Sequence, residues 1–192
     1  MARTVLLAAA SELEPLEQGK LDGLCGLYAI VNGIRVAAYP ECQVGLKVQR
    51  QLFRHGVAFL GRTRHLSTIV HAGMSGPLWR RMFKVMVTEA YGLTGTRLYY
   101  RFILMRDEPP TSRLAVQLIR RSLREGNPVI LTFWGRLNHT SVAVGFSDTR
   151  LILFDSFGLR WVALSGIGVD GDRSIKRHRL RASGVVSLSR FN

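Results

Sequence analysis

A polar loop runs into an apolar helical pattern in the stretch Gln18-Gly19-Lys20-Leu21-Asp22-Gly23-Leu24-Cys25-Gly26-Leu27-Tyr28-Ala29-Ile30-Val31-Asn32-Gly33. Apolar residues recur at helical spacing from Cys25 to Ala38, so we expect a largely buried helix that ends before Pro40. The N-terminus of a helix carries unpaired N–H groups and a partial positive charge, which would stabilise a thiolate at Cys25. Cys25 is therefore a candidate nucleophile, and catalysis requires partners from elsewhere in the chain.

The composition indicates a folded domain. The chain has 192 residues and is 47% hydrophobic, which suits a sizeable core and excludes a disordered protein. No apolar run approaches the roughly 20 residues of a membrane-spanning helix. The apolar run over residues 5–10 is shorter than the core of a secretory signal, and the acidic Ser11–Glu14 follows it. We therefore expect a cytoplasmic protein in which residues 1–192 form a single domain.

The charge is strongly basic, with a net charge of +14 from 27 basic and 13 acidic residues. Such a balance favours nucleic acid, an anionic membrane surface or an acidic protein as partner. No nucleic-acid-binding motif accompanies the densest basic cluster, and a basic surface without a specific partner explains the charge equally well. We expect a protein or peptide substrate, and our preferred role for the basic surface is to recruit an acidic protein substrate. The cluster consists of Arg173, Lys176, Arg177, Arg179 and Arg181.

Helical patterns dominate the first half of the chain. Apolar spacing and flanking glycines and prolines predict helices over Glu41–Leu60 and Pro77–Tyr91, and a further helix that is capped by Thr111 or Ser112 and runs through Arg124. Gly61–Gly76 is expected to be a loop or a short helix. Arg97–Leu104 has the composition of a strand, and Thr4–Ala9 is either a short strand or an extended arm.

Short apolar runs dominate the second half. Three of them, separated by turn-forming residues, predict an antiparallel meander, followed by two edge strands. Ser165–Ser183 is expected to be a mobile loop. The predicted fold class is α+β, with N-terminal helices, including a central helix that bears Cys25, packed on a C-terminal antiparallel sheet. The predicted strands are Val129–Trp134, His139–Phe146, Leu151–Phe154, Trp161–Leu164 and Val185–Phe191.

His139 is the histidine best placed to serve Cys25. It opens a predicted strand directly after the turn Gly135–Asn138, so its ring can face a cleft at the rim of the sheet. The alternative is a rim histidine that bonds a loop carbonyl. The remaining histidines lie in a predicted helix, in a loop without metal-ligand spacing and in the basic cluster, so we predict no metal and no cofactor. They are His55, His65, His71 and His178.

Asp155 is the candidate that orients the imidazole. It follows the strand after the one that His139 opens, and in a hairpin the start of one strand lies beside the end of the next. A buried aspartate without a partner would be costly, so a contact with His139 is expected. The alternative is an aspartate that caps the turn containing Ser156 and Gly158. Cys42, the other cysteine, is interpreted as a small core or helix residue rather than a redox partner.

The order of these parts resembles the papain-like cysteine peptidase superfamily, in which a helix-borne cysteine precedes a base and an orienting residue on a sheet. The segment His139–Phe146 with Leu153–Ser156 is similar to bacteriocin-leader peptidases. Gln18–Asn32 looks like the Josephin type of deubiquitinating peptidase. Unlike the family pattern, no tryptophan follows the pair Cys25-Gly26.

The resemblance implies a role for each candidate residue. Cys25 would be the nucleophile, His139 the general base and later acid, and Asp155 the group that orients the imidazole. Gln18 resembles the glutamine that, with the Cys25 backbone N–H, forms an oxyanion hole.

The function predicted on this basis is a cysteine-dependent hydrolase that cleaves a peptide or isopeptide bond through a thioester. A transglutaminase-like acyltransferase or a deamidase could use the same intermediate. A catalytically inactive basic module that binds an acidic protein or nucleic acid is the alternative from a different class.

Overall fold

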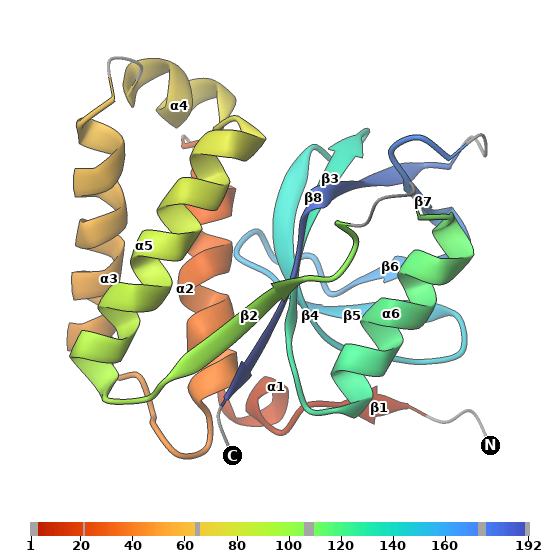
Figure 1. Cartoon of the computed structure of the whole chain (residues 1–192), viewed down its shortest axis with the longest axis horizontal. Coiled ribbons are helices and arrows are strands. Elements are labelled where there is room, and N and C mark those ends of the chain that lie inside the picture. Colours follow the sequence, from red (N-terminus) through yellow and green to blue (C-terminus); the bar gives the residue numbers. More distant parts are fainter. Residues whose placement is uncertain (1–3, 21, 64–65, 106–109, 173–175, 191–192) are drawn as a thin grey trace.

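The computed structural model of the protein describes residues 4–20, 22–63, 66–105, 110–172 and 176–190 (Figure 1). The helices are α1 (Ala9–Glu12), α2 (Cys25–Ala38), α3 (Leu46–Gly61), α4 (Leu66–Ala72), α5 (Gly76–Thr94) and α6 (Ser112–Arg124). The strands are β1 (Val5–Leu6), β2 (Leu98–Phe102), β3 (Val129–Gly135), β4 (His139–Phe146), β5 (Arg150–Phe154), β6 (Trp161–Ala163), β7 (Ile167–Val169) and β8 (His178–Arg190).

The described strands form one sheet. Its central path runs β2-β8-β3-β4-β5-β6, and every pair along this path is antiparallel. β1 adds to β4 antiparallel, whereas β7 runs parallel to β8. The predicted meander is confirmed in β3 to β5, and β6 is the predicted edge strand. The α+β class is confirmed, with the N-terminal helices packed on a mainly antiparallel C-terminal sheet.

Helices cover both faces of this sheet (Figure 1). α2 contacts β3, β4 and β8 on one face and is itself covered by α3 and α5, whereas α6 packs on the other face against β3, β4 and β7. Neighbouring residues on β3 therefore serve different cores: Ile130 belongs to the cluster under α2, and Leu131 to the cluster under α6. This alternation is the period of two expected of a strand buried on both faces.

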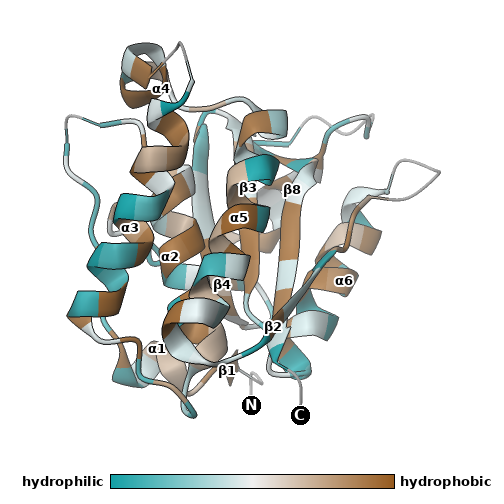
Figure 2. Ribbon diagram, turned by 60° about the vertical axis from the view of Figure 1, so that its left-hand side comes forward, coloured by the Kyte–Doolittle hydropathy of each residue, from teal (hydrophilic) through white to brown (hydrophobic). Residues whose placement is uncertain are grey.

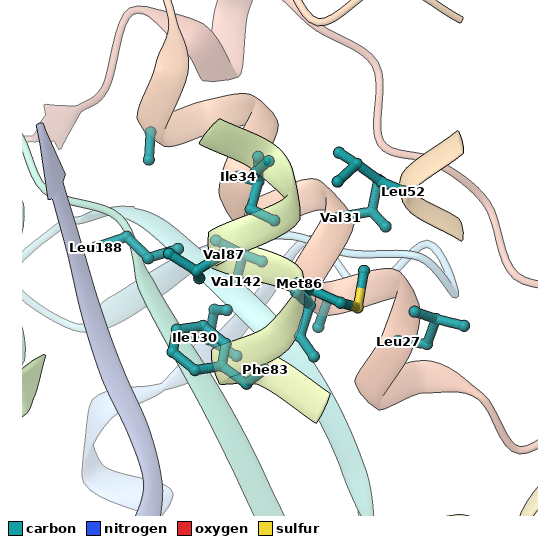
Figure 3. Close-up of a cluster of buried hydrophobic side chains, with 14 of the residues drawn as sticks. Leu27, Val31, Ile34, Leu52, Phe83, Met86, Val87, Ile130, Val142 and Leu188 are labelled. Atoms are coloured by element: carbon teal, nitrogen blue, oxygen red, sulfur yellow. The ribbon is translucent and has the colours of Figure 1, made fainter. Parts of the chain in front are cut away.

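The core under α2 is formed by buried aliphatic and aromatic side chains (Figure 3). The residues labelled there come from α2, α3, α5 and three strands: Leu27, Val31, Ile34, Leu52, Phe83, Met86, Val87, Ile130, Val142 and Leu188. α2 is buried along nearly its whole length, whereas α3 is largely exposed and shows hydrophilic residues mixed with hydrophobic ones (Figure 2). No helix in the described part of the chain is long and apolar enough to span a membrane.

Gly33 sets how closely α2 approaches the sheet. A Cβ atom at this position would lie 3.0 Å from Ile130 and 3.1 Å from Leu188. Because the glycine leaves this space to its neighbours, the helix backbone lies directly on β3 and β8. The same approach holds the first turn of α2, and hence Cys25, beside the sheet.

The predicted α2 is confirmed over Cys25–Ala38, but two other helices differ at their ends. α3 begins at Leu46 rather than at Glu41, because Gly45 is extended and the Gln49 side chain donates a hydrogen bond to the Val44 carbonyl, in place of a further helical turn. α5 continues past Gly92 to Thr94. The left-handed Gly95, with φ of 70°, is its actual stop.

The prediction for the C-terminal segment was wrong. Ser165–Ser183 is not a loop throughout: it contains β7 and the first half of β8. β8 is not an edge strand either, since it lies between β2 and β3. The predicted short helix between α3 and α5 is observed as α4, while His65 and Arg173 lie outside the described residues.

Substitution of Gly33 by leucine should destabilise the protein by about 2 kcal/mol or more, because the side chain has to displace Ile130 and Leu188 from a packed core. The matched control is Gly92→Ala on α5, where a Cβ meets no atom within 4 Å. Alanine should stabilise that helix by about 0.5 kcal/mol. Urea unfolding of both variants measures the difference, and equal effects would contradict the close approach of α2.

Candidate active site

Three of the sequence-predicted residues meet at one end of the sheet. Cys25 is the first residue of α2, His139 is the first residue of β4, and Asp155 directly follows β5. The Cys25 thiol is hydrogen-bonded to the His139 ring. On the other side of the ring, His139 Nε2 lies 2.7 Å from Asp155 Oδ2. The histidine therefore lies between the cysteine and the aspartate and contacts both of them.

Asp155 is rigidly held. Its side chain is fully buried, and its Oδ1 accepts hydrogen bonds from the backbone N–H groups of Phe157 at 2.8 Å and Leu159 at 3.0 Å. The turn after β5 thus occupies one carboxylate oxygen and leaves the other for His139. The turn-capping role and the histidine-orienting role, weighed as alternatives from the sequence, are both present in one side chain.

The electrostatics favour a charged pair. Burial alone would raise the pKa of the Cys25 thiol, but the hydrogen bond and charge attraction of His139, with contributions from Thr140, bring that pKa below its ordinary value. Burial would lower the pKa of His139, but its interactions with Asp155 and Cys25 raise it to about 9. Burial likewise opposes ionisation of Asp155, yet the hydrogen bond with His139 lowers the pKa of that carboxyl. All three shifts favour the charged forms, which are a thiolate, an imidazolium and a carboxylate.

The loop before α2 is fixed at several points. The buried Asn32 accepts a hydrogen bond from the Leu16 N–H at 2.8 Å and donates one to the Leu16 carbonyl, which ties the incoming chain to the helix. Asp22 accepts a hydrogen bond from the Leu24 N–H at 3.0 Å. Gly23 packs so tightly against the end of α4 that a Cβ would lie 2.9 Å from the Gly73 nitrogen. The position of Cys25 therefore depends on contacts with both α2 and α4.

Gln18 lies in the same cleft as Cys25. Its backbone N–H donates to the Ser156 carbonyl at 2.8 Å, and its side-chain amide donates to the Asp22 carbonyl. Its buried Oε1 has no hydrogen-bond partner within the described part of the chain. Since an amide has two N–H bonds, one remains for a ligand. Gln18 is thus brought to the site, and its role in an oxyanion hole stays a prediction.

Trp79 is a supporting residue that the sequence reasoning missed. Its indole N–H donates to the Gly26 carbonyl at 3.1 Å, and a Cβ on Gly26 would lie 2.7 Å from its ring. Trp79 therefore packs directly on the first turn of α2. The available signal was its position three residues before Met82, on the apolar face of the predicted helix.

The cleft around Cys25 has a volume of about 750 Å³. One wall comes from the chain between α4 and α5, including Met74, and the other from β3, β8 and the turn after β5. Exposed aromatic residues stand on the sheet side: Phe157 is 63% exposed, with its ring 6.4 Å from the His139 ring, and Trp134 is 40% exposed. The cleft thus combines apolar walls with the polar side chains of Cys25, His139 and Asp155.

The other candidates lie elsewhere or play other parts. Cys42 is a free thiol that packs against the core, in agreement with its interpretation as a small core residue. His55 pairs with Glu89 at 3.2 Å on the surface, and His178 packs edge-on against Phe133. His71 lines the cleft. Among the described residues, no cluster of three or more histidine, cysteine or carboxylate side chains could hold a metal.

Compared with known proteins, the chain matches no family model, no curated protein and no solved structure.

Cys25 should react with iodoacetamide at about pH 6 far faster than Cys42 in the same chain, since its lowered pKa gives it a larger thiolate fraction than an ordinary thiol has. In His139→Ala, burial of the thiol persists but the cation is lost, so the pKa of Cys25 rises. Alkylation at that pH should then slow by at least about tenfold, the effect of one pKa unit.

Mass spectrometry of the two cysteine-containing peptides measures both rates in one sample. Asp155→Asn should slow alkylation of Cys25 less than His139→Ala does, since the imidazole stays in place. Equal rates at Cys25 and Cys42 in the native protein would refute the charged pair.

Proposed function

We propose that the protein is a papain-like cysteine hydrolase that cleaves a peptide or isopeptide bond in a protein substrate. The observation that carries this proposal is the chain of contacts from Cys25 to His139 to Asp155. It begins at the N-terminus of a buried helix and lies in an open cleft. A nucleophile, a base and an orienting group in mutual contact form the arrangement that activates a thiol.

The first half of the reaction forms a thioester. The Cys25 thiolate attacks the substrate carbonyl, and the oxygen takes up negative charge. The backbone N–H of Cys25 belongs to the first turn of α2, whose amides have no acceptor within the helix, and it can donate to this oxygen. The remaining Gln18 N–H is the second donor in this proposal. The His139 imidazolium then gives its proton to the leaving amine as the C–N bond breaks.

The second half releases the acid. His139, now neutral, removes a proton from a water molecule that attacks the thioester carbonyl. The C–S bond then breaks, which releases the acid and regenerates the Cys25 thiolate. The proton taken from water stays on His139, so the thiolate–imidazolium pair is restored. Asp155 keeps the His139 ring oriented throughout, because two hydrogen bonds from backbone N–H groups prevent the Asp155 carboxylate from rotating.

The raised pKa of His139 and the lowered pKa of Cys25 define the pH range of activity. The rate should rise with pH through the pKa of Cys25, where the thiolate forms, and fall above about pH 9, where His139 loses the proton that the leaving amine needs. A pH–rate profile of peptide cleavage measures both the rise and the fall of the rate. A rate that keeps rising above that pH would contradict the role of His139 as acid.

The test is cleavage of a proteome-derived peptide library, read as new termini by mass spectrometry. The native protein should produce cleavages that Cys25→Ala and His139→Ala abolish and that Asp155→Asn reduces. Cys42→Ala is the matched control and should cleave like the native protein. Activity lost in Cys42→Ala but retained in Cys25→Ala would overturn the assignment.

The same library separates the alternatives that share the thioester. With a primary amine added, a transferase joins the amine to glutamine side chains, and a deamidase converts glutamine to glutamate without new termini. Either product in place of cleavage would replace the hydrolase proposal by that activity. If none of these products forms and Cys25 is unreactive, the binding-module alternative replaces the enzyme.

A further inference from the structure

A second, basic cavity adjoins the cleft. It has a volume of about 700 Å³ and shares two lining residues, Trp134 and Arg181, with the cleft that contains Cys25. We call it the basic pocket. Its charged lining residues are Arg136, Asp170, Lys176, Arg177, Arg179 and Arg181.

Strand register explains why these cations gather. Trp134 on β3 is the direct partner of Arg179 on β8, so both side chains point to the same face of the sheet. Side chains alternate along a strand, and Arg181 therefore points to this face as well. The intervening Leu180 is fully buried in the core on the opposite face, under α6. Arg179 and Arg181 thus lie on one face of a central strand, and Lys176 and Arg177 directly precede this strand.

Arg181 stands at the junction of the two cavities. Its guanidinium lies 3.7 Å from the centre of the Trp134 ring, a cation–π contact. On its other side, it reaches Gly76 at the start of α5, where a Cβ would lie 2.8 Å from the guanidinium. Arg181 thus bridges the sheet wall and the helix wall of the cleft, and a chain leaving Cys25 past Trp134 enters the basic pocket.

A break in the β-ladder produces this geometry. Only Thr132 separates Leu131 from Phe133 on β3, whereas residues 181–184 separate their partners Val185 and Leu180 on β8. Such irregularities bend a strand and redirect its side chains, and they are frequent beside functional sites. Here the irregular segment begins directly after Leu180, and both Arg181 and Gly184, at its two ends, line the cleft.

The charge of the basic pocket is not neutralised within the described part of the chain. Asp170 is the one carboxylate among its lining residues, and none of its arginines or lysines takes part in an ion pair between the described residues. Like charges held this close repel one another, so a bound anion would relieve the repulsion. Guanidinium groups favour carboxylates, which they bind through paired N–H donors.

We propose that the basic pocket is a substrate subsite for acidic side chains, glutamate or aspartate, in the chain that passes Trp134 from the scissile bond. This inference rests on the proposed hydrolase function. Continuity with the cleft through Trp134 and Arg181 favours a peptide over nucleic acid. Among the described residues that line the pocket, Trp134 is also the one aromatic side chain, whereas single-stranded nucleic acid needs a series of stacking platforms.

The test measures binding of fluorescein-labelled oligoglutamate and oligoglutamine of equal length to Cys25→Ser protein, by anisotropy at about 150 mM salt. Oligoglutamate should bind at least about tenfold more tightly than oligoglutamine. Arg177→Gln with Arg179→Gln, both at exposed positions, should weaken oligoglutamate binding by about tenfold. The matched control removes the same charge at exposed positions on α3 and α6, Arg54→Gln with Arg113→Gln, and should leave binding within about twofold.

Equal losses in the two double variants would overturn the proposal, since binding would then follow net charge alone. An oligothymidine probe of similar length that binds more tightly than oligoglutamate, with the same dependence on Arg177 and Arg179, would assign the surface to nucleic acid instead.

A second measurement links the basic pocket to the cleft. In native protein, unlabelled oligoglutamate should slow alkylation of Cys25, and it should not do so in the Arg177/Arg179 double variant. Binding without this protection would show that the basic pocket is separate from the cleft and would overturn the subsite. If Cys25 is unreactive under all conditions, the hydrolase proposal fails on its own, while the anisotropy experiment still decides whether the pocket binds carboxylates.

Discussion

The close packing of α2 on the sheet is the constraint on which the rest of the structure depends. With Gly33 against Ile130 and Leu188, the helix is held at one distance and angle from β3 and β8. That placement brings the N-terminus of α2 to the end of the sheet where β4 begins and β5 ends. The contact of Cys25 on the helix with His139 on the sheet therefore depends on core packing as well as on the loop before α2.

The candidate site was accessible to sequence reasoning because its parts lie at the ends of regular elements. The proximity of His139 and Asp155 was predicted from the strand pattern and from the geometry of a hairpin. The position of Cys25 at the start of a helix was predicted from the apolar periodicity of α2. The supporting residues were not accessible in this way. Trp79 reaches Gly26 from another helix, and Gly73 reaches Gly23 across the end of α4, so neither contact has a signal in local pattern.

The fold was predicted well where the hydrophobic periodicity of one segment identifies the element. It was predicted poorly where pairing with distant strands determines whether a segment is buried in the sheet. The meander and α2 required no long-range information. β8 did, because its first half alternates arginine with His178 and Leu180, a pattern that lacks the apolar content by which a central strand is usually identified. Its burial comes from β2, β3 and β7, which pair with it from distant parts of the chain.

The position of β8 has a consequence for how the protein is made. β8 follows every other described strand in the chain, yet it separates β2 from β3 in the finished sheet. While the chain is being synthesised, these two strands have no partner between them, and the wall formed by Arg181 and Gly184 is missing from the cleft. Cys25 leaves the ribosome before β8 does, and the cleft around it is complete only when β8 has been inserted. A nascent chain would therefore present Cys25 before the cleft beside it is complete, so that, on the proposed function, it could not yet hold a substrate.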